Sequence, residues 1–382
     1  MKRVTVAVDS FKGSLSSREV AEAVELGITA VLPDCKVRKV SIADGGEGTV
    51  EAMVENLSGE WVEVEVCDPL MRPIDIRYGV VDDGRTAVME MSAASGLPLL
   101  AVTERNPLKT TTYGTGQMIA DAVKSGVRRL LIGIGGSATN DAGVGMLEAL
   151  GFRFYDAENR PLSGGGEILQ RIARIDGQNV MPQLSECEFV VACDVKNPLY
   201  GETGAAYVFA PQKGADEAMV RELDAGLRNF AQVVADYCGE DLSLLPGAGA
   251  AGGLGFAFKA LLGAELRPGI EMVLDAINFA SIIEDSDLVI TGEGKIDRQT
   301  VMGKAPSGVL RAARSQDIPT IAIGGAVEMC EELAESDFVA ILPIVAGPIK
   351  LSEAMRKDVA HKNVRRTIEQ IVRLLNLKQK SC

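Results

Sequence analysis

The sequence has almost no histidine or tryptophan. Its 382 residues include one of each, His361 and Trp61. A single histidine argues against a Ser-His-Asp triad, against a histidine-rich zinc site and against a relay of paired histidines. Any chemistry is therefore expected from carboxylates, lysines, hydroxyls and backbone amides.

Positive charge is also scarce. Asp and Glu total 53 against 39 Lys and Arg, which gives a formal net charge of −14. Such a field repels nucleic acid and anionic membranes, and the longest basic stretch is only Lys362–Arg366. The sequence also has no run of 18 apolar residues, so it predicts no membrane span. We expect neither nucleic acid nor a membrane as a partner.

The cysteines and the N-terminus predict a cytoplasmic protein. The seven cysteines are odd in number and include no Cys-x-x-Cys pair, so we expect reduced thiols. Met1 to Arg3 lead directly into the strand-like run Val4–Val8, which is unlike a signal peptide. The oligomeric state is open at this point, and a homo-oligomer is one possibility.

Strand-like apolar runs alternate with helical patterns near both ends of the chain. Val4–Val8 and Val37–Ile42 are each followed by a glycine loop and a helical pattern, and Ser16 and Glu19 have the spacing of a capping box. Buried strands are also predicted at 287–290, 319–323 and 338–342. These patterns predict an α/β fold with a doubly wound parallel-sheet domain, Rossmann- or flavodoxin-like, built from both chain ends.

The segment 61–91 has a different pattern. Trp61–Val66 alternates with period two, and Asp82-Asp83-Gly84 is a hairpin signal between two further strands. We interpret this segment as the start of an inserted mixed α/β domain. The predicted domains are 1–60 plus 285–382 for the parallel sheet and 61–284 for the insertion, with the active site in the cleft between them.

Five loops share one design, in which glycines and polar residues follow an apolar strand. Glycine lets backbone N–H groups approach an anion closely, and a helix N-terminus adds partial positive charge. In open α/β sheets such loops line the ligand crevice at the carboxyl ends of the strands. The loops are 9–14, 44–49, 133–145, 247–255 and 291–300.

Carboxylates gather in or near these loops. They are Asp9, Asp44, Glu47, Asp141, Asp194, Glu293 and Asp297. Helix capping explains some of them, for which Asp9 and Asp141 are candidates. The others would repel one another in one crevice unless a cation were present, and hard oxygen ligands indicate Mg²⁺ with a nucleotide. Lys12 is the main candidate to neutralise a transferring phosphate, and Lys295 and Lys304 are weaker ones.

Phosphoryl transfer fits this set of residues, because it needs positioning, Mg²⁺ and charge stabilisation but no histidine. A Walker A loop is missing, since Gly303-Lys304-Ala305 lacks the hydroxyl residue after the lysine, and the protein-kinase motifs are missing too. A kinase of this sequence therefore needs another phosphate-binding loop. A non-catalytic acid-binding regulator is a further alternative.

An NAD(P)-dependent hydroxy-acid dehydrogenase is the main alternative. Gly133-x-Gly135-x-x-Ala138 follows a strand, and Asp156 comes about twenty residues later, as in a dinucleotide fingerprint. The helix that should follow contains Gly143 and Gly145, each of which costs about 1 kcal/mol relative to alanine. The only histidine also lies in a polar C-terminal helix, away from this motif.

The five loops together resemble the bacterial glycerate kinase type 1 family. The resemblance runs from the first strand to about residue 345 and rests on five ordered motifs, at 9–16, 43–49, 134–141, 249–255 and 291–300. One departure is Ala142, where the family more often has glycine after the aspartate, and we expect a small side chain to be tolerated there. The resemblance implies ATP-dependent, Mg²⁺-assisted phosphorylation of D-glycerate, generally at the 2-hydroxyl, by two α/β domains with the site between them.

From this resemblance and the chemistry above we expect the following roles. Lys12, Asp44 and Asp194 are catalytic, with Asp44 or Asp194 as the base, and Asp194 and Asp297 are candidate Mg²⁺ ligands. The residues expected to bind glycerate are Ser10, Lys12, Asp44, Glu47, Ser137, Asn140 and Asp141. Those expected to bind ATP are Gly135, Gly136, Gly252, Gly253, Gly255, Thr291, Gly292, Glu293 and Gly294.

Overall fold

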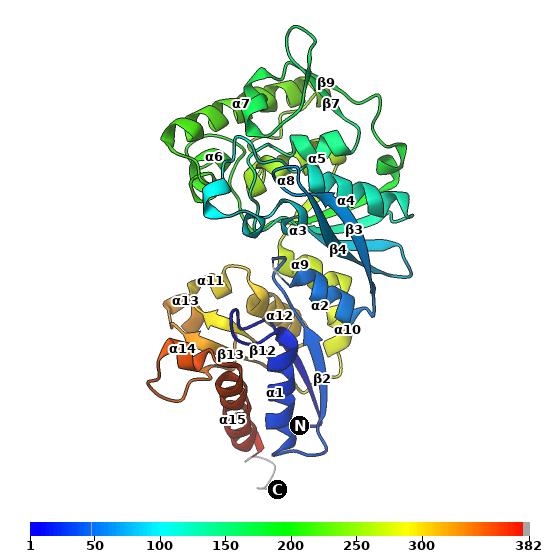
Figure 1. Ribbon diagram of the computed structural model, residues 1–382. Coiled ribbons are helices and arrows are strands. Elements are labelled where there is room, and N and C mark those ends of the chain that lie inside the picture. The colour runs from blue at the N-terminus through cyan, green and yellow to red at the C-terminus, as the bar shows by residue number, and fades with distance from the viewer. Residues whose placement is uncertain (47, 377–382) are drawn as a thin grey trace. The chain divides into compact units, whose positions relative to one another are not determined.

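Both ends of the chain build one unit of the structure, and the middle of the chain builds another (Figure 1). The computed structural model describes residues 1–46 and 48–376. Unit 1 combines Met1–Asp44 with the chain from Ile270 onward, and unit 2 is Gly45–Gly269. The predicted contribution of both chain ends to one domain is therefore found.

Unit 1 contains a five-stranded sheet in which all neighbouring strands are parallel. Its spatial order is β14 (Ala340–Pro343), β13 (Thr320–Val327), β12 (Leu288–Ile296), β1 (Arg3–Val8) and β2 (Lys36–Ser41). Val8 at the end of β1 is paired with Gly292 on one side and with Ser41 on the other. The loops that follow β1 and β2 therefore leave the sheet at the same edge, level with the middle of β12, which continues to Ile296.

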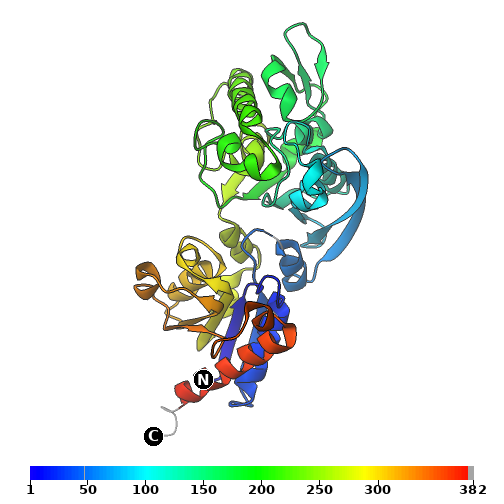
Figure 2. The same cartoon turned by 60° about the vertical axis from the view of Figure 1, so that its left-hand side comes forward.

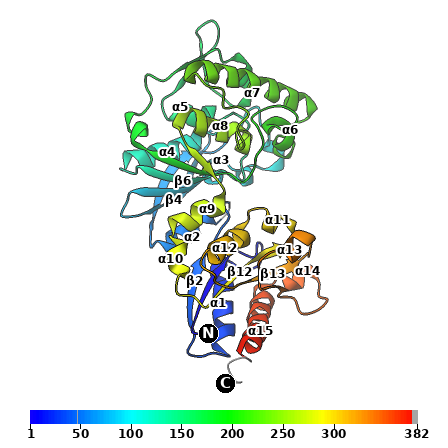
Figure 3. The same ribbon diagram turned by 180° about the vertical axis from the view of Figure 1, so that it is seen from behind.

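Helices cover both faces of this sheet. On one face α1 (Ser17–Thr29) and α15 (Lys357–Asn376) lie side by side, and Figure 2 shows the red α15 next to the blue N-terminal segment. Ser16 caps α1 in the predicted capping box with Glu19. On the other face α12 (Ala305–Arg314) packs on β12 and β13 (Figure 3). The remaining helices are α9 (Gly269–Ala276), α10 (Phe279–Ile283), α11 (Arg298–Val301), α13 (Glu331–Ala334) and α14 (Leu351–Ala354).

Unit 2 contains a mixed six-stranded sheet. Its spatial order is β11 (Glu265–Arg267), β10 (Glu188–Ala192), β6 (Arg129–Gly133), β5 (Thr86–Glu90), β4 (Pro73–Val81) and β3 (Glu60–Cys67). The strands from β11 to β5 are parallel, and β5, β4 and β3 form the predicted antiparallel meander. A separate small antiparallel sheet has the order β8 (Pro161–Leu162), β7 (Arg153–Tyr155), β9 (Arg174–Asp176).

One continuous apolar core holds unit 2 together, and its largest buried side chains include Tyr78, Phe154, Phe230 and Phe256. The helices around it are α2 (Thr49–Asn56), α3 (Ser92–Ser95), α4 (Tyr113–Lys124), α5 (Val144–Ala149), α6 (Ala205–Phe209), α7 (Glu217–Cys238) and α8 (Ala250–Leu262). Short 3₁₀ turns lie at Leu97–Leu99, Val102–Glu104, Gly166–Arg171, Pro182–Glu186 and Pro211–Lys213.

The unit boundaries fall earlier in the chain than the predicted domain boundaries. The chain passes between units after residues 44 and 269, whereas the sequence pattern placed these points after residues 60 and 284. The difference arises because α2 packs on β4 and β5 of unit 2, while α10 packs on α12 of unit 1. Neither preference is visible in the periodicity of a short helix.

The predicted fold class is confirmed, since both units are α/β and unit 1 is a doubly wound parallel sheet. Within residues 1–46 and 48–376, none of the helices combines the length and the apolar character that crossing a membrane requires.

Candidate active site

A cavity of about 400 Å³ lies at the carboxyl ends of the unit 1 strands. Its lining residues are of two kinds. The polar ones are Asp9, Ser10, Lys12, Ser14, Asp44, Glu293, Lys295 and Lys304. The apolar ones include Phe11, Ile344, Val345, Leu351, Ala354, Met355 and Ala360. The structure thus brings together five predicted site residues from three separate segments of the sequence, namely Ser10, Lys12, Asp44, Glu293 and Gly294.

Asp9 lies in this cavity and is not a helix cap. Its backbone N–H donates to the carbonyl of Gly292 at 2.9 Å, which continues the pairing of β1 with β12. The following helix is capped by Ser16, so the capping interpretation of Asp9 is wrong. Burial, then the charge of Asp44, raises the pKa of Asp9 to about 7, although the Ser10 N–H and Lys12 oppose this. A carboxyl group that titrates near neutrality can accept a proton at physiological pH.

Glu293 is held beside a lysine in the same cavity. Its Oε1 accepts a hydrogen bond from the Thr300 hydroxyl at 2.6 Å, and its Oε2 lies 3.7 Å from Nζ of Lys304. Burial raises the pKa of Glu293, whereas Thr300 and Lys304 oppose the shift. Lys304 was only a weak candidate from the sequence, yet it lines the cavity together with Lys12. The cavity therefore has three lysines, of which Lys295 is paired with Asp297 and Glu328, while Lys12 and Lys304 can face an anion.

Asp297, a predicted Mg²⁺ ligand, is already engaged by protein groups. Its carboxylate accepts from the Gln299 N–H at 2.9 Å at the start of α11, and Nζ of Lys295 lies 3.2 Å away. Burial alone would raise the pKa of Asp297, but the Gln299 N–H and Lys295 bring it below its ordinary value. Asp297 thus has a capping role that the sequence analysis had given to other aspartates.

The loop after β6 forms a second polar cluster, in unit 2. Gly135 and Gly136 are exposed at its tip, whereas Ser137 and Asn140 are buried at 7% and 0% exposure. Lys213 lies behind the loop, and its Nζ donates to the Ser137 hydroxyl and to the Thr139 carbonyl, both at 2.6 Å. No sequence signal points to Lys213, because it lies 76 residues from Ser137 and outside every glycine loop.

Asp141 joins two helix starts from a fully buried position. Its carboxylate accepts hydrogen bonds from the Thr112 N–H before α4 and from the Gly143 and Gly145 N–H groups around the start of α5. Burial raises the pKa of Asp141, and these hydrogen bonds oppose the shift. Of the two roles expected for Asp141, helix capping and glycerate binding, the structure shows the first, because its carboxylate accepts from helix N–H groups.

The predicted ATP-binding glycines of α8 pack against the same loop. Gly252 and Gly253 have φ of +70° and +93°, which side chains rarely adopt. A Cβ on Gly252 would lie 2.1 Å from the Thr139 carbonyl oxygen. Gly255 is likewise buried, and a Cβ there would lie 2.3 Å from the Gly247 carbonyl oxygen. Close packing of the protein on itself is thus one reason for glycine at these positions.

The remaining predicted residues are placed as follows. Asp194 is exposed in unit 2 after β10, and its Oδ1 accepts from the Gly269 N–H at 3.0 Å. Thr291 and Gly292 are interior residues of β12, and the Thr291 hydroxyl is one of the buried groups without a hydrogen-bond partner among the described residues. Gly294 lines the unit 1 cavity. Glu47 lies outside the described residues.

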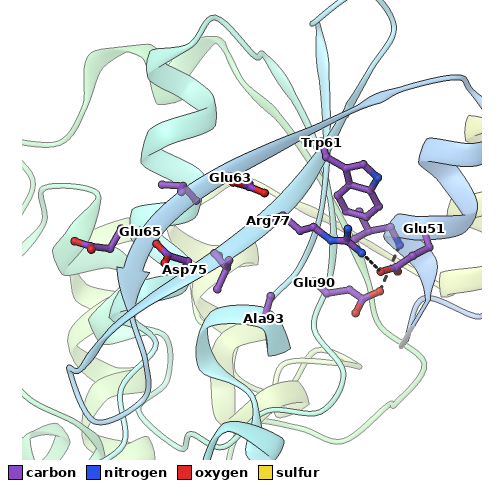
Figure 4. A pocket seen from close by; sticks show the side chains of 11 residues that line it. Glu51, Trp61, Glu63, Glu65, Asp75, Arg77, Glu90 and Ala93 are labelled. Carbon is purple, nitrogen blue, oxygen red and sulfur yellow. Dashed lines mark hydrogen bonds and ion pairs between the residues drawn. The ribbon is translucent and has the colours of Figure 1, made fainter.

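A larger cavity of about 580 Å³ in unit 2 is a poorer candidate (Figure 4). The Arg77 guanidinium lies 3.9 Å from the centre of the Trp61 ring and pairs with Glu51 at 3.3 Å. The residues that line this larger cavity include none from the five glycine loops. The smaller cavity of unit 1 has the lysines and the carboxylates that phosphoryl transfer needs, so we give it more weight.

Comparison with known proteins identifies the family. The family model described as the glycerate kinase family matches residues 4–376. The chain belongs to the glycerate kinase family. It is 46% identical over 376 residues to a glycerate kinase of Bacillus subtilis (98% of both chains). It is 47% identical over 325 residues to a glycerate 2-kinase of Escherichia coli (85% of both chains). A crystal structure assigned to glycerate kinase 2 of Salmonella typhimurium LT2 matches with a TM-score of 0.91 and 44% identity, covering 99% of each chain.

Membership of the glycerate kinase family confirms the resemblance drawn from the five glycine loops. It supports an ATP-dependent kinase and gives no support to the dehydrogenase alternative. The Gly133-x-Gly135 loop leads into α5, which has only 6 residues and starts after Gly143 at φ +75°, so no long dinucleotide-binding helix follows it.

Proposed function

We propose that this member of the glycerate kinase family transfers the γ-phosphoryl group of ATP to D-glycerate, at the 2-hydroxyl, to give 2-phosphoglycerate and ADP. The observation that carries the proposal is the unit 1 cavity. There Asp9 and Lys12 after β1 and Asp44 after β2 gather with Glu293 of β12 and with Lys304 at the start of α12. Parallel α/β sheets bind ligands at this edge. The expectations of a site between the two domains and of a homo-oligomer stay predictions.

The acceptor hydroxyl needs a base, and we propose Asp9 for this step in addition to the earlier candidates Asp44 and Asp194. Asp9 lines the cavity, and its pKa of about 7 lets it exist as a carboxylate at physiological pH while still holding a proton well. It would take the proton from the hydroxyl oxygen as that oxygen attacks the γ-phosphorus. Asp44 and Asp194 stay candidates for the same step.

Lys12 and Lys304 supply positive charge to the transferring phosphoryl group in this proposal. Phosphoryl transfer spreads negative charge over the equatorial oxygens, and fixed cations stabilise that charge. Lys12 is exposed at the cavity, while Lys304 is half-buried against Glu293. Because the whole protein is strongly acidic, these lysines also give two anionic substrates a locally favourable site.

Mg²⁺ is proposed to enter together with ATP. The described residues contain no group of three or more carboxylate, histidine or cysteine side chains placed to hold a metal ion. At kinase sites Mg²⁺ generally uses one or two carboxylates together with phosphate oxygens and water. Asp194 and Asp297 stay the proposed ligands, and the bound ion would neutralise phosphate charge.

A coupled assay tests the proposal. Purified protein is incubated with ATP, Mg²⁺ and D-glycerate, and enolase converts only 2-phosphoglycerate directly to a product with ultraviolet absorbance. We expect turnover that EDTA abolishes and excess Mg²⁺ restores. ADP release without an enolase signal would indicate that the 3-hydroxyl is phosphorylated instead. Absence of ADP release with D-glycerate would refute the kinase itself, and NAD(P)H oxidation with hydroxypyruvate serves as the dehydrogenase control.

A further inference from the structure

Lys213 is a charged side chain in the interior of unit 2. It ends the short turn Pro211–Lys213 and is only 2% exposed. Burial of an ammonium group is costly unless the protein compensates it, and such lysines often have a function. The hydrogen bonds to Ser137 and to Thr139 use two of the three N–H groups of Lys213. The nearby charge of Asp141 also favours the protonated form.

The hydrogen bond to Ser137 has a direction. An ammonium group only donates, so the Ser137 oxygen is the acceptor. The hydrogen of the Ser137 hydroxyl must therefore go to a different acceptor. Among the described residues, the bond from Lys213 is the only hydrogen bond of this hydroxyl. Ser137 directly follows Gly135 and Gly136, which are exposed at the tip of the loop.

A neighbouring side chain gives independent evidence that a ligand binds to this loop. Asn140 is 0% exposed, and neither its side-chain oxygen nor its side-chain nitrogen has a hydrogen-bond partner among the described residues. The same is true of the Thr139 hydroxyl. Buried amides without partners are rare and costly in folded proteins. A loop that carries a fixed hydroxyl donor and an unsatisfied amide is suited to bind a polar molecule.

We propose that Lys213 is a positioning residue that turns the Ser137 hydroxyl into a donor for an oxyanion of the substrates. The oxyanion is either the carboxylate of glycerate or a phosphate of ATP, and both have the same chemistry toward a hydroxyl donor. Exposed glycine N–H groups at 135 and 136 would add to the same site. This inference rests on the proposed kinase function and names the anion-binding loop of that function.

The proposal predicts a dependence on pH. Protonated Lys213 donates to Ser137, whereas a neutral amine can accept from it, and the hydroxyl then no longer points at the ligand. Burial is the main cause that lowers the pKa of Lys213 to about 7, and Asp141 opposes it. Oxyanion binding is therefore strong below the pKa of Lys213 and is lost as the pH rises through it. Bound anion will itself raise this pKa.

A double-mutant cycle tests the inference in the full chain. KM for D-glycerate and KM for ATP are measured for the wild type, Lys213→Met, Ser137→Ala and the double variant. We expect each single variant to raise one of the two KM values at least tenfold, and the double variant to be no worse than Ser137→Ala. A rise for glycerate assigns the loop to the carboxylate, and a rise for ATP assigns it to phosphate. Independent, multiplying effects would overturn the proposal, as would unchanged KM values.

Two further measurements keep the test sharp. If Lys213→Met does not fold, the ratio of KM between pH 8.5 and 6.5 is compared for the wild type and Ser137→Ala, and only the wild type should show the rise. Lys124→Met, an exposed lysine at the end of α4, is the matched control and should behave as the wild type. Thermal shifts with D-glycerate or ATP, weaker in both variants, report binding without turnover. A wild type without turnover but with these shifts would refute only the kinase.

Discussion

The Asp141 carboxylate accepts hydrogen bonds from both the backbone N–H and the hydroxyl of Thr112, each at 2.8 Å. The Thr112 hydroxyl oxygen in turn accepts from the Met146 N–H at 2.9 Å. The two residues thus connect the start of α4 with the first turn of α5 through buried groups. This network holds the loop that carries Ser137 and Asn140, so Asp141 is better suited to position that loop than to contact glycerate itself.

Asp141→Asn is expected to destabilise the protein by about 2–3 kcal/mol, because a buried charged acceptor is replaced by a group that presents N–H to other donors. Urea unfolding followed by circular dichroism measures the change. Asp83→Asn is the matched control, since Asp83 is an exposed hairpin residue at φ +52°, which asparagine adopts readily. Equal stability of Asp141→Asn and the wild type would contradict the positioning role.

The sequence predicted the parallel sheet and the glycine loops well, because both depend on local patterns. Val4–Val8 and its loop could be recognised without any tertiary information, and β1 ends at Val8 as expected. The partners of these loops could not be predicted in the same way. In the sequence Asp9 resembles a helix cap, because its proximity to Asp44 and Glu293 depends on strand order, and Lys213 has no local signal at all. The surroundings of both residues come from segments that are distant in the sequence, so local patterns could not predict them.

Lys12→Ala is expected to lower kcat/KM more than tenfold, because Lys12 lines the unit 1 cavity beside Asp9 and Asp44. A loss mainly in kcat would indicate charge stabilisation in the transition state, whereas a loss mainly in KM would indicate ground-state binding. Lys36→Ala, an exposed lysine on β2, is the control. A decrease of less than tenfold would remove Lys12 from the catalytic residues.

Substitutions of Ala142 test how much side-chain volume and backbone strain the loop after β6 tolerates. It is fully buried with φ +51°, a backbone conformation that glycine adopts without strain and in which a β-branched residue is strongly strained. Ala142→Gly should change the free energy of unfolding by less than about 1 kcal/mol, since relief of backbone strain offsets the loss of a buried methyl group. Ala142→Val should cost about 3 kcal/mol or more from strain and overpacking. Chemical denaturation of both variants measures this, and a well-tolerated valine would contradict the left-handed conformation.

Asp9→Asn should separate stability from activity. The pKa of Asp9 is raised to about 7 mainly by burial, so the folded state binds a proton that the unfolded state releases near pH 4. Stability from this group therefore falls as the pH rises from about 4 to 7, and at pH 8 the asparagine variant should be more stable than the wild type, by up to about 4 kcal/mol.

The activity of Asp9→Asn, in contrast, should be lower than that of the wild type. If Asp9 is the base, kcat/KM of the wild type falls as the pH drops below about 7, and Asp9→Asn loses about 10²–10⁴-fold together with that pH dependence. Asp34→Asn, an exposed aspartate of the same unit, should alter neither quantity. An Asp9→Asn enzyme that kept the wild-type pH profile would assign the proton transfer to another carboxylate.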